Sequence, residues 1–428
     1  MEAGAVLHSE HNRGDMNGNE KALEGVRVVD MTHVQAGPVC TQMLAWLGAD
    51  VIKVEPPGRG DVTRQQLRDI PDVDSLYFTM LNSNKRSLTL DIKSPEGRKI
   101  FERLVAVSDV MVENFAPGAL DRQGLTWEYL HELNPRLIYG SIKGFGPGDY
   151  ETAKAYETIA QAMGGSMSTT GFEDGPPTST GAQIGDSGTA VHLVAALLAA
   201  LYQRERTGRG QRVQVAMQHS VLNLCRVKIR DHQRLAHGPL GEYPNKTFNG
   251  FVPRSGNASG GGQPGWAVRC KPGGPNDYAY VIIQPQVWAP LMALIGRDDL
   301  IEDPAWATPE ARVSHLEEVF AVVEQWSLQH EKWDVYEKLN AINVPCGPIL
   351  DTEDLVADQS LRKSGMIVEV DHPERGTYLT VGCPLRLSDS PVEIERSPLL
   401  GEHCADVLTN VLALGNEEVE RLRSEGVI

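Results

Sequence analysis

The sequence predicts an α/β fold with a Rossmann-like large domain built on a parallel sheet. The chain opens with a strand, a helix and a second strand between residues 25 and 55, and this alternation recurs through residue 142. A helix between two neighbouring strands makes those strands parallel, and repeated units of this kind build an open, doubly wound sheet. The length of 428 residues exceeds what one compact core accommodates, so we expect further domains.

Short apolar runs predict the strands of this sheet, and capping residues predict the helices between them. The strands are expected at residues 25–30, 51–55, 110–112 and 137–142. One helix follows the first strand, at residues 37–48. Another begins after Ser94, because Ser94 can cap it and Pro95 suits its first position. Thr126 can cap the next helix, which ends before Pro135.

The second half of the chain predicts a smaller α+β domain and a return to the mixed pattern. The expected elements are a helix at 186–206, a strand at 211–215, a helix at 218–233, a strand at 278–283, a helix at 287–295 and a helix after Thr308. The segment 238–265 is rich in glycine, proline, asparagine and serine. A loop of this length inside a compact domain is usually functional or disordered. We expect the last hundred or so residues to rejoin the large domain.

Composition argues against several classes of protein. The formal net charge is −17 and the pI about 5.2, which argues against a nucleic-acid-binding surface. Residues 1–22 are polar, so we expect a disordered extension there and no signal peptide. The longest apolar stretch, 190–202, is far shorter than the roughly 20 residues of a membrane span. The six cysteines form no C-x-x-C pair, which favours reduced thiols and a cytoplasmic location.

Asp186 is the most suggestive residue, and two interpretations of it stay open. It lies between Gly185 and Ser187 at the start of the long apolar helix. An aspartate there is often a helix cap, and this is the more common role. A carboxylate can also attack a thioester carbonyl as a covalent nucleophile. In that case Ser187 could serve as the cap.

Other candidate residues lie in loops. Gly260, Gly261 and Gly262 could bring backbone N–H groups close to an anion, or form a flexible linker. His33 and Gln35 follow the first strand, where open α/β sheets bind ligands. That turn lacks G-x-G-x-x-G, and the chain carries no G-x-x-x-x-G-K-[ST] loop. Cationic residues that could bind phosphate, or be solvated surface charges, are Lys85, Arg86, Lys93, Arg122 and Lys154.

Several motifs, in order, carry a resemblance to a known family. They are Leu23–Pro38, Ser83–Ser87, Val112–Phe115, Gly171–Pro177, Gly185–Ser187, Gly260–Trp266 and Pro398–His403. Together they resemble the class III CoA-transferases of the CaiB/BaiF type from about Leu23 to the C-terminus. The resemblance implies an interlocked homodimer without a permanent cofactor or metal, acting on acyl-CoA and a small dicarboxylate. It implies no nucleic-acid partner and no membrane partner.

The resemblance also implies domain boundaries and a reaction. The implied large domain covers 23–218 and 342–428, the linkers 219–242 and 319–341, and the small domain 243–318 with the glycine loop. The implied reaction moves coenzyme A from formyl-CoA to oxalate, through aspartyl anhydride and aspartyl-CoA thioester intermediates. Succinyl-CoA is an alternative donor. A 2-methylacyl-CoA racemase is a remote alternative, because its catalytic histidine would fall at Tyr156, and tyrosine is a poor base near pH 7.

The resemblance assigns roles to individual residues. Asp186 matches the nucleophile, and Gln35 matches a residue at the thioester. Gly260, Gly261 and Gly262 match a loop that protects intermediates. Residues around the small acid are matched by Tyr77, Tyr156 and Glu157. The CoA-binding surface is matched by His33, Gln35, Ala36, Leu90, Lys93, Asn114, Phe115, Ala116, Arg122, Lys154 and Tyr156.

Three positions depart from the family pattern. Ser259 replaces the first glycine of the loop, and Pro56 replaces an arginine that binds CoA. Gln66 stands where a relative has tryptophan. We expect these changes to affect loop mobility, phosphate contacts and the strictness of acid selection.

Overall fold

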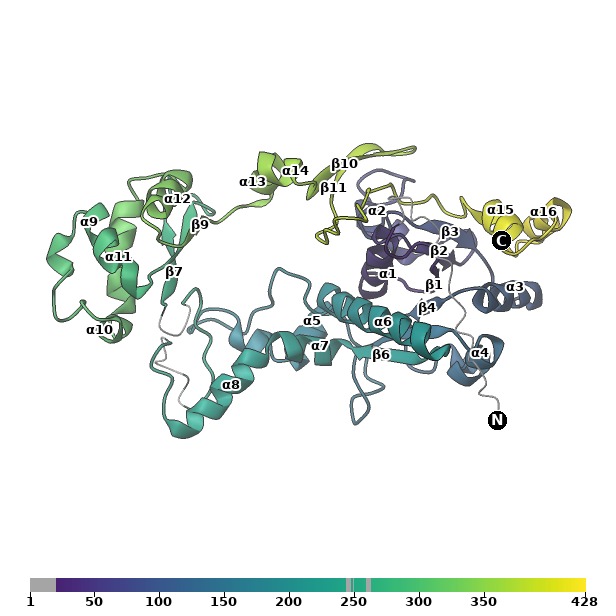
Figure 1. The fold of residues 1–428 in the computed structure, drawn as a ribbon, viewed down its shortest axis with the longest axis horizontal. Helices are drawn as coiled ribbons and strands as arrows, with labels where there is room; N and C mark the ends of the chain where they lie inside the picture. Colours follow the sequence, from purple (N-terminus) through teal and green to yellow (C-terminus); the bar gives the residue numbers. More distant parts are fainter. Residues whose placement is uncertain (1–20, 244–247, 249, 259–262) are drawn as a thin grey trace, which may run out of the picture. The chain divides into compact units, whose positions relative to one another are not determined.

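The computed structural model describes residues 21–243, 248, 250–258 and 263–428 (Figure 1). The expected disordered extension therefore lies outside the described residues, apart from its last two positions. The chain divides into two compact units. The first contains residues 1–142, 190–214 and 365–428, and the second contains 143–189 and 215–364. The domain boundaries implied by the resemblance stay a prediction.

A six-stranded sheet with the order β3-β2-β1-β4-β5-β6 forms the centre of the first unit. Its strands are β1 (Arg27–Asp30), β2 (Asp50–Glu55), β3 (Arg86–Thr89), β4 (Val110–Glu113), β5 (Ile138–Lys143) and β6 (Arg212–Ala216). The pairs β1–β2, β1–β4, β2–β3 and β4–β5 are all parallel. This order is the doubly wound Rossmann arrangement, which confirms the predicted α/β class. The strand β3 was not predicted.

Capping side chains start several helices of this unit at the predicted positions. Ser94 accepts a hydrogen bond from Gly97 N at the start of α3 (Pro95–Ala106). Thr126 does the same for Tyr129 N at the start of α4 (Trp127–Leu133). The helix α1 (Ala36–Trp46) follows β1, and α2 (Leu76–Leu81) precedes β3. These caps satisfy backbone N–H groups that have no partner within the helix.

Residues near the C-terminus pack in the same core as the central strands. This core joins Val29 and Phe101 to Val407 and Leu422. The C-terminal helices α15 (Cys404–Asp406) and α16 (Asn416–Ser424) belong to it, and an antiparallel hairpin precedes them, formed by β10 (Ile367–His372) and β11 (Gly376–Val381). The last part of the chain therefore stabilises the sheet that the first part builds.

The second unit has its own sheet and core. The strands β7 (Gly265–Arg269), β8 (Tyr278–Ile282) and β9 (Cys346–Pro348) pair antiparallel in that order. Helices of this unit include α5 (Glu157–Met163), α9 (Trp288–Leu294), α10 (Pro309–Val313), α11 (Leu316–Ser327), α12 (Lys332–Ala341), α13 (Thr352–Ala357) and α14 (Gln359–Lys363). Buried side chains of α11 and α12 pack in the core of this sheet, although we expected a linker at 319–341.

The helix predicted at 218–233 is two helices in the structure. They are α7 (Met217–Leu224) and α8 (Arg226–Arg234). Between them Cys225 has φ −90° and ψ 7°, which interrupts the helical hydrogen-bond ladder. The predicted long helix is present as α6 (Ser187–Thr207). No helix in the described ranges is both long and apolar enough to cross a membrane.

Candidate active site

The predicted site residues fall into two groups, one in each unit. The first unit holds His33, Gln35, Ala36, Tyr77, Leu90, Lys93, Asn114, Phe115, Ala116 and Arg122. The second unit holds Lys154, Tyr156, Glu157 and Asp186. Gly260, Gly261 and Gly262 lie outside the described residues.

Asp186 lies in a short turn that leads directly into α6, and the side chain of Glu157 binds the backbone of this turn. Glu157 is the first residue of α5. Its carboxylate accepts hydrogen bonds from Gly185 N at 2.9 Å and from Asp186 N at 2.5 Å. Gln161, one turn later on α5, donates to the same carboxylate at 2.7 Å. Gly185 is required here, because an added Cβ would lie 2.7 Å from Glu157 O.

The carboxylate of Asp186 is half-buried and accepts no hydrogen bond from the part of the chain that the structure describes. Glu157, rather than Asp186, takes the backbone donors at this helix start. Burial, with the Glu157 charge as a second cause, raises the pKa of Asp186 to about 7. Both causes disfavour the charged form. The carboxylate is thus not occupied as a cap, and its unpaired oxygens suit a nucleophile.

Neither Lys154 nor Tyr156 is enclosed within the second unit. Tyr156 precedes α5, and 70% of it is exposed. Lys154 is also exposed. The structure brings Glu157, but not these two residues, into hydrogen-bond contact with the Asp186 turn. Their predicted roles stay predictions.

The loop Thr32–Ala36 joins β1 to α1 and carries three of the predicted residues, and we name it the Gln35 loop. His33 N donates to Asn114 Oδ1 at 3.0 Å, and Asn114 Nδ2 donates back to His33 O at 2.8 Å. The His33 and Phe115 rings lie 5.2 Å apart. Burial lowers the pKa of His33, so its ring is neutral near pH 7. The structure thus brings His33, Asn114 and Phe115 together, and their role at CoA stays a prediction.

Gln35 is held by a second predicted residue. Tyr77 OH donates to Gln35 Oε1 at 3.0 Å, which fixes the orientation of the amide. Gln35 is 8% exposed, and Ala36 beside it is 4% exposed. This hydrogen bond uses the acceptor oxygen of the amide, and the amide nitrogen is the donor side of the same group.

A cavity of about 440 Å³ opens beside the Gln35 loop. His33, Phe115, Val62 and Pro56 are among its lining residues, and they give it largely apolar walls. Arg59 also lines it, is exposed, and makes no ion pair or hydrogen bond within the described residues. Sequence reasoning missed Arg59. It lies three positions after Pro56, and Pro56 stands where the family pattern has an arginine. The search for replacement charge near Pro56 would have found it.

The other predicted cations behave in two ways. Lys93 and Arg122 are exposed, as phosphate-binding or solvated residues would be. The interpretation of Lys85 as a surface or phosphate-binding charge is wrong, because Lys85 is buried and pairs with Asp30 at 3.0 Å. Arg86 pairs with Asp50 and Asp406.

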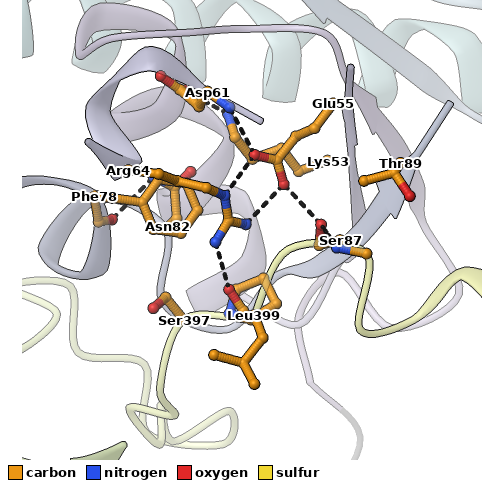
Figure 2. Close-up of polar contacts among 12 residues, drawn as sticks. Lys53, Glu55, Asp61, Arg64, Phe78, Asn82, Ser87, Thr89, Ser397 and Leu399 are labelled. Atoms are coloured by element: carbon orange, nitrogen blue, oxygen red, sulfur yellow. Dashed lines mark hydrogen bonds and ion pairs between the residues drawn. The ribbon is translucent and has the colours of Figure 1, made fainter. Parts of the chain in front are cut away.

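Sequence reasoning also missed a cluster of charged residues under the Gln35 loop. We name it the buried ion-pair network, and its members are Asp30, Lys53, Glu55, Asp61, Arg64, Asp74 and Lys85. Figure 2 shows Arg64 and Ser87 converging on the Glu55 carboxylate, with Asp61 and Lys53 beside it. Its ion pairs are Lys53–Asp61, Arg64–Glu55, Arg64–Asp74 and Lys85–Asp30. No local signal marks these residues, because their partners lie on different strands and loops.

Comparisons with known proteins identify the family of this chain. The family model described as CoA-transferase family III matches residues 23–404. A Streptomyces avermitilis protein named formyl-CoA:oxalate CoA-transferase is 67% identical over 408 residues, which cover 95% of this chain and 100% of that protein. A Rhodopseudomonas palustris protein of the same name is 58% identical over 412 residues, covering 95% and 97%.

A solved structure gives the same result. The crystal structure of a CAIB/BAIF family protein from Brucella suis matches with a TM-score of 0.77 and 33% identity, covering 91% of this chain and 99% of that chain. The family match covers well over half of the sequence and includes Asp186 and the Gln35 loop. The resemblance inferred from the motifs is confirmed, and the chain belongs to CoA-transferase family III.

Proposed function

We propose that this protein transfers coenzyme A from formyl-CoA to oxalate, giving oxalyl-CoA and formate, with Asp186 as the covalent nucleophile. The observation that carries the choice of donor and acceptor is the 67% identity to a protein of that name over 95% of this chain. The observation that carries the role of Asp186 is its unpaired carboxylate at the start of α6. CoA thioesters are substrates in this scheme, and no resident cofactor takes part.

The reaction proceeds through four exchanges at one carboxylate. An oxygen of Asp186 attacks the carbonyl carbon of formyl-CoA, the C–S bond breaks, and CoA thiolate leaves an aspartyl-formyl anhydride. The thiolate attacks the aspartyl carbonyl, which releases formate and forms an aspartyl-CoA thioester. Oxalate then displaces the thiolate to form an aspartyl-oxalyl anhydride. The thiolate attacks the oxalyl carbonyl, so oxalyl-CoA leaves and the Asp186 carboxylate is restored.

Glu157 tunes the nucleophile in this proposal. Burial, with the negative charge of Glu157 as the second cause, raises the pKa of Asp186 to about 7, so the carboxylate is more basic than an ordinary aspartate. A more basic carboxylate is a stronger nucleophile once it is ionised, while about half of it is ionised at neutral pH. The hydrogen bonds from Gly185 N and Asp186 N to Glu157 keep the turn in place during the exchanges.

The cavity beside the Gln35 loop is proposed to hold part of CoA. Its apolar walls suit the adenine ring, and Arg59 offers an unpaired guanidinium to a phosphate group. The acidic groups that line it do not cancel this charge, since Glu55 pairs with Arg64 and Asp61 with Lys53. Gln35 keeps the role at the thioester that the resemblance assigns to it, and Tyr77, Tyr156 and Glu157 each keep the assigned role of binding the small acid. The glycine residues 260–262 shield the intermediates from water.

A homodimer in the cytoplasm is part of the proposal. Large apolar side chains are uncovered on several helices of the single chain, and a second copy would bury them. They include Val191, Tyr202, Leu222, Leu224, Val227 and Ile229, which are 44–70% exposed. Analytical ultracentrifugation should give twice the chain mass of 46.8 kDa. Ile229→Glu should shift the species towards monomer, and a monomeric wild-type protein would contradict the assembly.

The direct test of the substrates compares two donors. With oxalate as acceptor, we expect kcat/KM for formyl-CoA to exceed that for succinyl-CoA by at least about tenfold, measured as oxalyl-CoA formed. A preference for succinyl-CoA would reject the donor while keeping the role of Asp186. If neither donor yields oxalyl-CoA, the oxalate assignment fails.

A further inference from the structure

The Gln35 loop has a strained backbone that its own residues do not explain. Val34, next to Gln35, has φ 65°. Left-handed geometry is unfavourable for a β-branched residue such as valine and persists only where the surroundings enforce it. Gly37, at the following helix start, packs closely on Thr32, because an added Cβ there would lie 2.3 Å from Thr32 Cβ. Something outside the loop therefore holds this conformation.

Buried charged side chains fix the Gln35 loop in this conformation. Lys53 Nζ donates to Thr32 O at 2.8 Å and pairs with Asp61 Oδ2 at 3.0 Å. The other oxygen of Asp61 accepts from Val34 N at 3.4 Å. The side chains of Lys53 and Asp61 are 0% and 1% exposed, so water cannot replace either partner. One ion pair thus fixes backbone groups on both sides of His33.

The same network supports the residue that orients Gln35. Asp61 N donates to Glu55 Oε1, which also accepts from Arg64 Nε at 2.8 Å. The Arg64 guanidinium lies 3.7 Å from the centre of the Phe78 ring, next to Tyr77 in α2. The Tyr77–Gln35 hydrogen bond is thus connected to this buried set of charges on both sides, through the Gln35 loop and through Phe78.

We propose that the Lys53–Asp61 ion pair is a positioning device for Gln35, which holds its amide where it meets the CoA thioester. This inference rests on the role of Gln35 in the proposed function. Lys53 and Asp61 do not themselves touch substrate in this account. They act by fixing the strained loop, and a shift of about 1 Å at a reacting group can lower a rate by about 100-fold.

A double-mutant cycle tests the positioning role. Lys53→Met should lower kcat/KM for CoA transfer about 100-fold when Gln35 is present, but less than about threefold in a Gln35→Ala background. All rates are taken per folded enzyme, well below the melting temperature of each variant. Equal losses in both backgrounds would overturn the proposal, because a general structural defect adds independently of Gln35. A wild-type rate in Gln35→Ala alone would also overturn it.

Matched variants keep the result interpretable. Arg86→Met removes a cation of β3 and breaks its ion pairs with Asp50 on β2 and Asp406 on α15, so its losses should be equal in both backgrounds. If Lys53→Met does not fold, Asp61→Asn enters the same cycle, because it removes the charge and keeps the shape of the side chain. An additive result with Asp61→Asn overturns the proposal just as well.

A second readout separates this inference from the choice of substrates. The dissociation constant of free CoA, measured by calorimetry, depends on neither formyl-CoA nor oxalate. We expect Lys53→Met to raise it about tenfold in the presence of Gln35 and less than about threefold in its absence. A wild type that binds CoA but makes no oxalyl-CoA would refute the proposed reaction only, and the cycle would then be judged on CoA affinity.

Discussion

The buried carboxylates of Asp30, Glu55 and Asp61 in the first unit and that of Asp186 in the second unit have opposite electrostatic surroundings. Burial by itself would raise the pKa of Asp61, but Lys53 and hydrogen bonds from Thr63 outweigh it and bring the pKa to about 2. Burial also raises the pKa of Asp186. The charged neighbour of Asp186 is Glu157, which raises the pKa further, to about 7. The same residue type is therefore a fixed structural anion in one region and a titrating group in the other.

The difference lies in what accompanies burial. In the buried ion-pair network, Asp30 faces Lys85, Glu55 faces Arg64 and Asp61 faces Lys53. A carboxylate paired in this way is stable and unreactive, because its lone pairs are already occupied. Asp186 lacks such a cation in the described part of the chain, so its desolvation is not offset. Perturbed carboxylates of this kind are typical of reacting groups.

The largest expected effect separates the two regions by activity. Asp186→Ala should lower CoA transfer by at least about 10⁴-fold, because it removes the carboxylate that forms the anhydride. Its affinity for free CoA should stay within about threefold of wild type, as measured by calorimetry. Asp61→Asn, in contrast, should retain measurable transfer. Comparable activity in Asp186→Ala and Asp61→Asn would remove the distinction between the two carboxylates.

The second effect separates them by stability. Lys53→Met should lower the free energy of unfolding by about 3–5 kcal/mol, because Asp61 is left as an unpaired buried charge. Asp186→Asn should raise the free energy of unfolding by about 1–3 kcal/mol at pH 8. This range is reduced because the side chain is partly exposed and solvent screens its charge. Denaturant unfolding of both variants measures this. A stabilising Lys53→Met or a destabilising Asp186→Asn at pH 8 would reverse the comparison.

The sign of the Asp186 contribution changes with pH. Its pKa is raised in the folded state, so wild-type stability from this group is complete below pH 3.8 and is lost as pH rises through about 7. The advantage of Asp186→Asn should therefore be small at pH 4 and grow between pH 4 and pH 8. A constant difference across this range would mean that Asp186 has an ordinary pKa.

A smaller effect concerns Glu157. We expect kcat/KM of the wild type to rise with pH up to an apparent pKa near 7, because the ionised carboxylate is the nucleophile. Glu157→Gln should move the rising part of this kcat/KM profile to lower pH by about one unit. Burial would still raise the pKa of Asp186 above its ordinary value. The maximal kcat/KM at high pH should also fall, because glutamine offers one acceptor oxygen to Gly185 N and Asp186 N where glutamate offers two. An unchanged rising part would contradict the coupling of Glu157 and Asp186.

The smallest effect extends the comparison to cations. Lys53 is paired and structural, whereas Arg59 lines the cavity and has no ion-pair partner among the described residues. Arg59→Gln should weaken CoA binding about tenfold and reduce its dependence on salt, with little change in melting temperature. Calorimetry at two ionic strengths measures both. Unchanged affinity would remove Arg59 from the CoA site.

Sequence reasoning succeeded where the signal is local. The alternation of strands and helices gives the parallel sheet, and Ser94 and Thr126 cap helices as expected. Asp186 could be singled out because a glycine precedes it at a helix start. The choice between cap and nucleophile could not be made, since the residue that takes the backbone donors, Glu157, lies 29 positions away.

The buried network shows where local signals end. Lys85 lies in a polar stretch that reads as a surface turn, yet its partner Asp30 is 55 positions away on β1. Pairing of β2 and β3 beside β1 is what buries it, and no pattern around residue 85 encodes that pairing. The strand β3 was missed for the same reason. Long-range ion pairs depend on which strands are neighbours in the sheet. The sequence pattern predicts the fold class but not this strand order.

The most direct test of the difference between the two regions is a covalent trap. The protein is incubated with formyl-CoA, quenched with hydroxylamine, digested and analysed by peptide mass spectrometry. Hydroxylamine converts an aspartyl anhydride or thioester to a hydroxamate. We predict a hydroxamate at Asp186 and unmodified carboxylates at Glu157 and Asp61. A hydroxamate at another carboxylate, or none at Asp186 while CoA transfer proceeds, would contradict the assignment of Asp186 as the nucleophile.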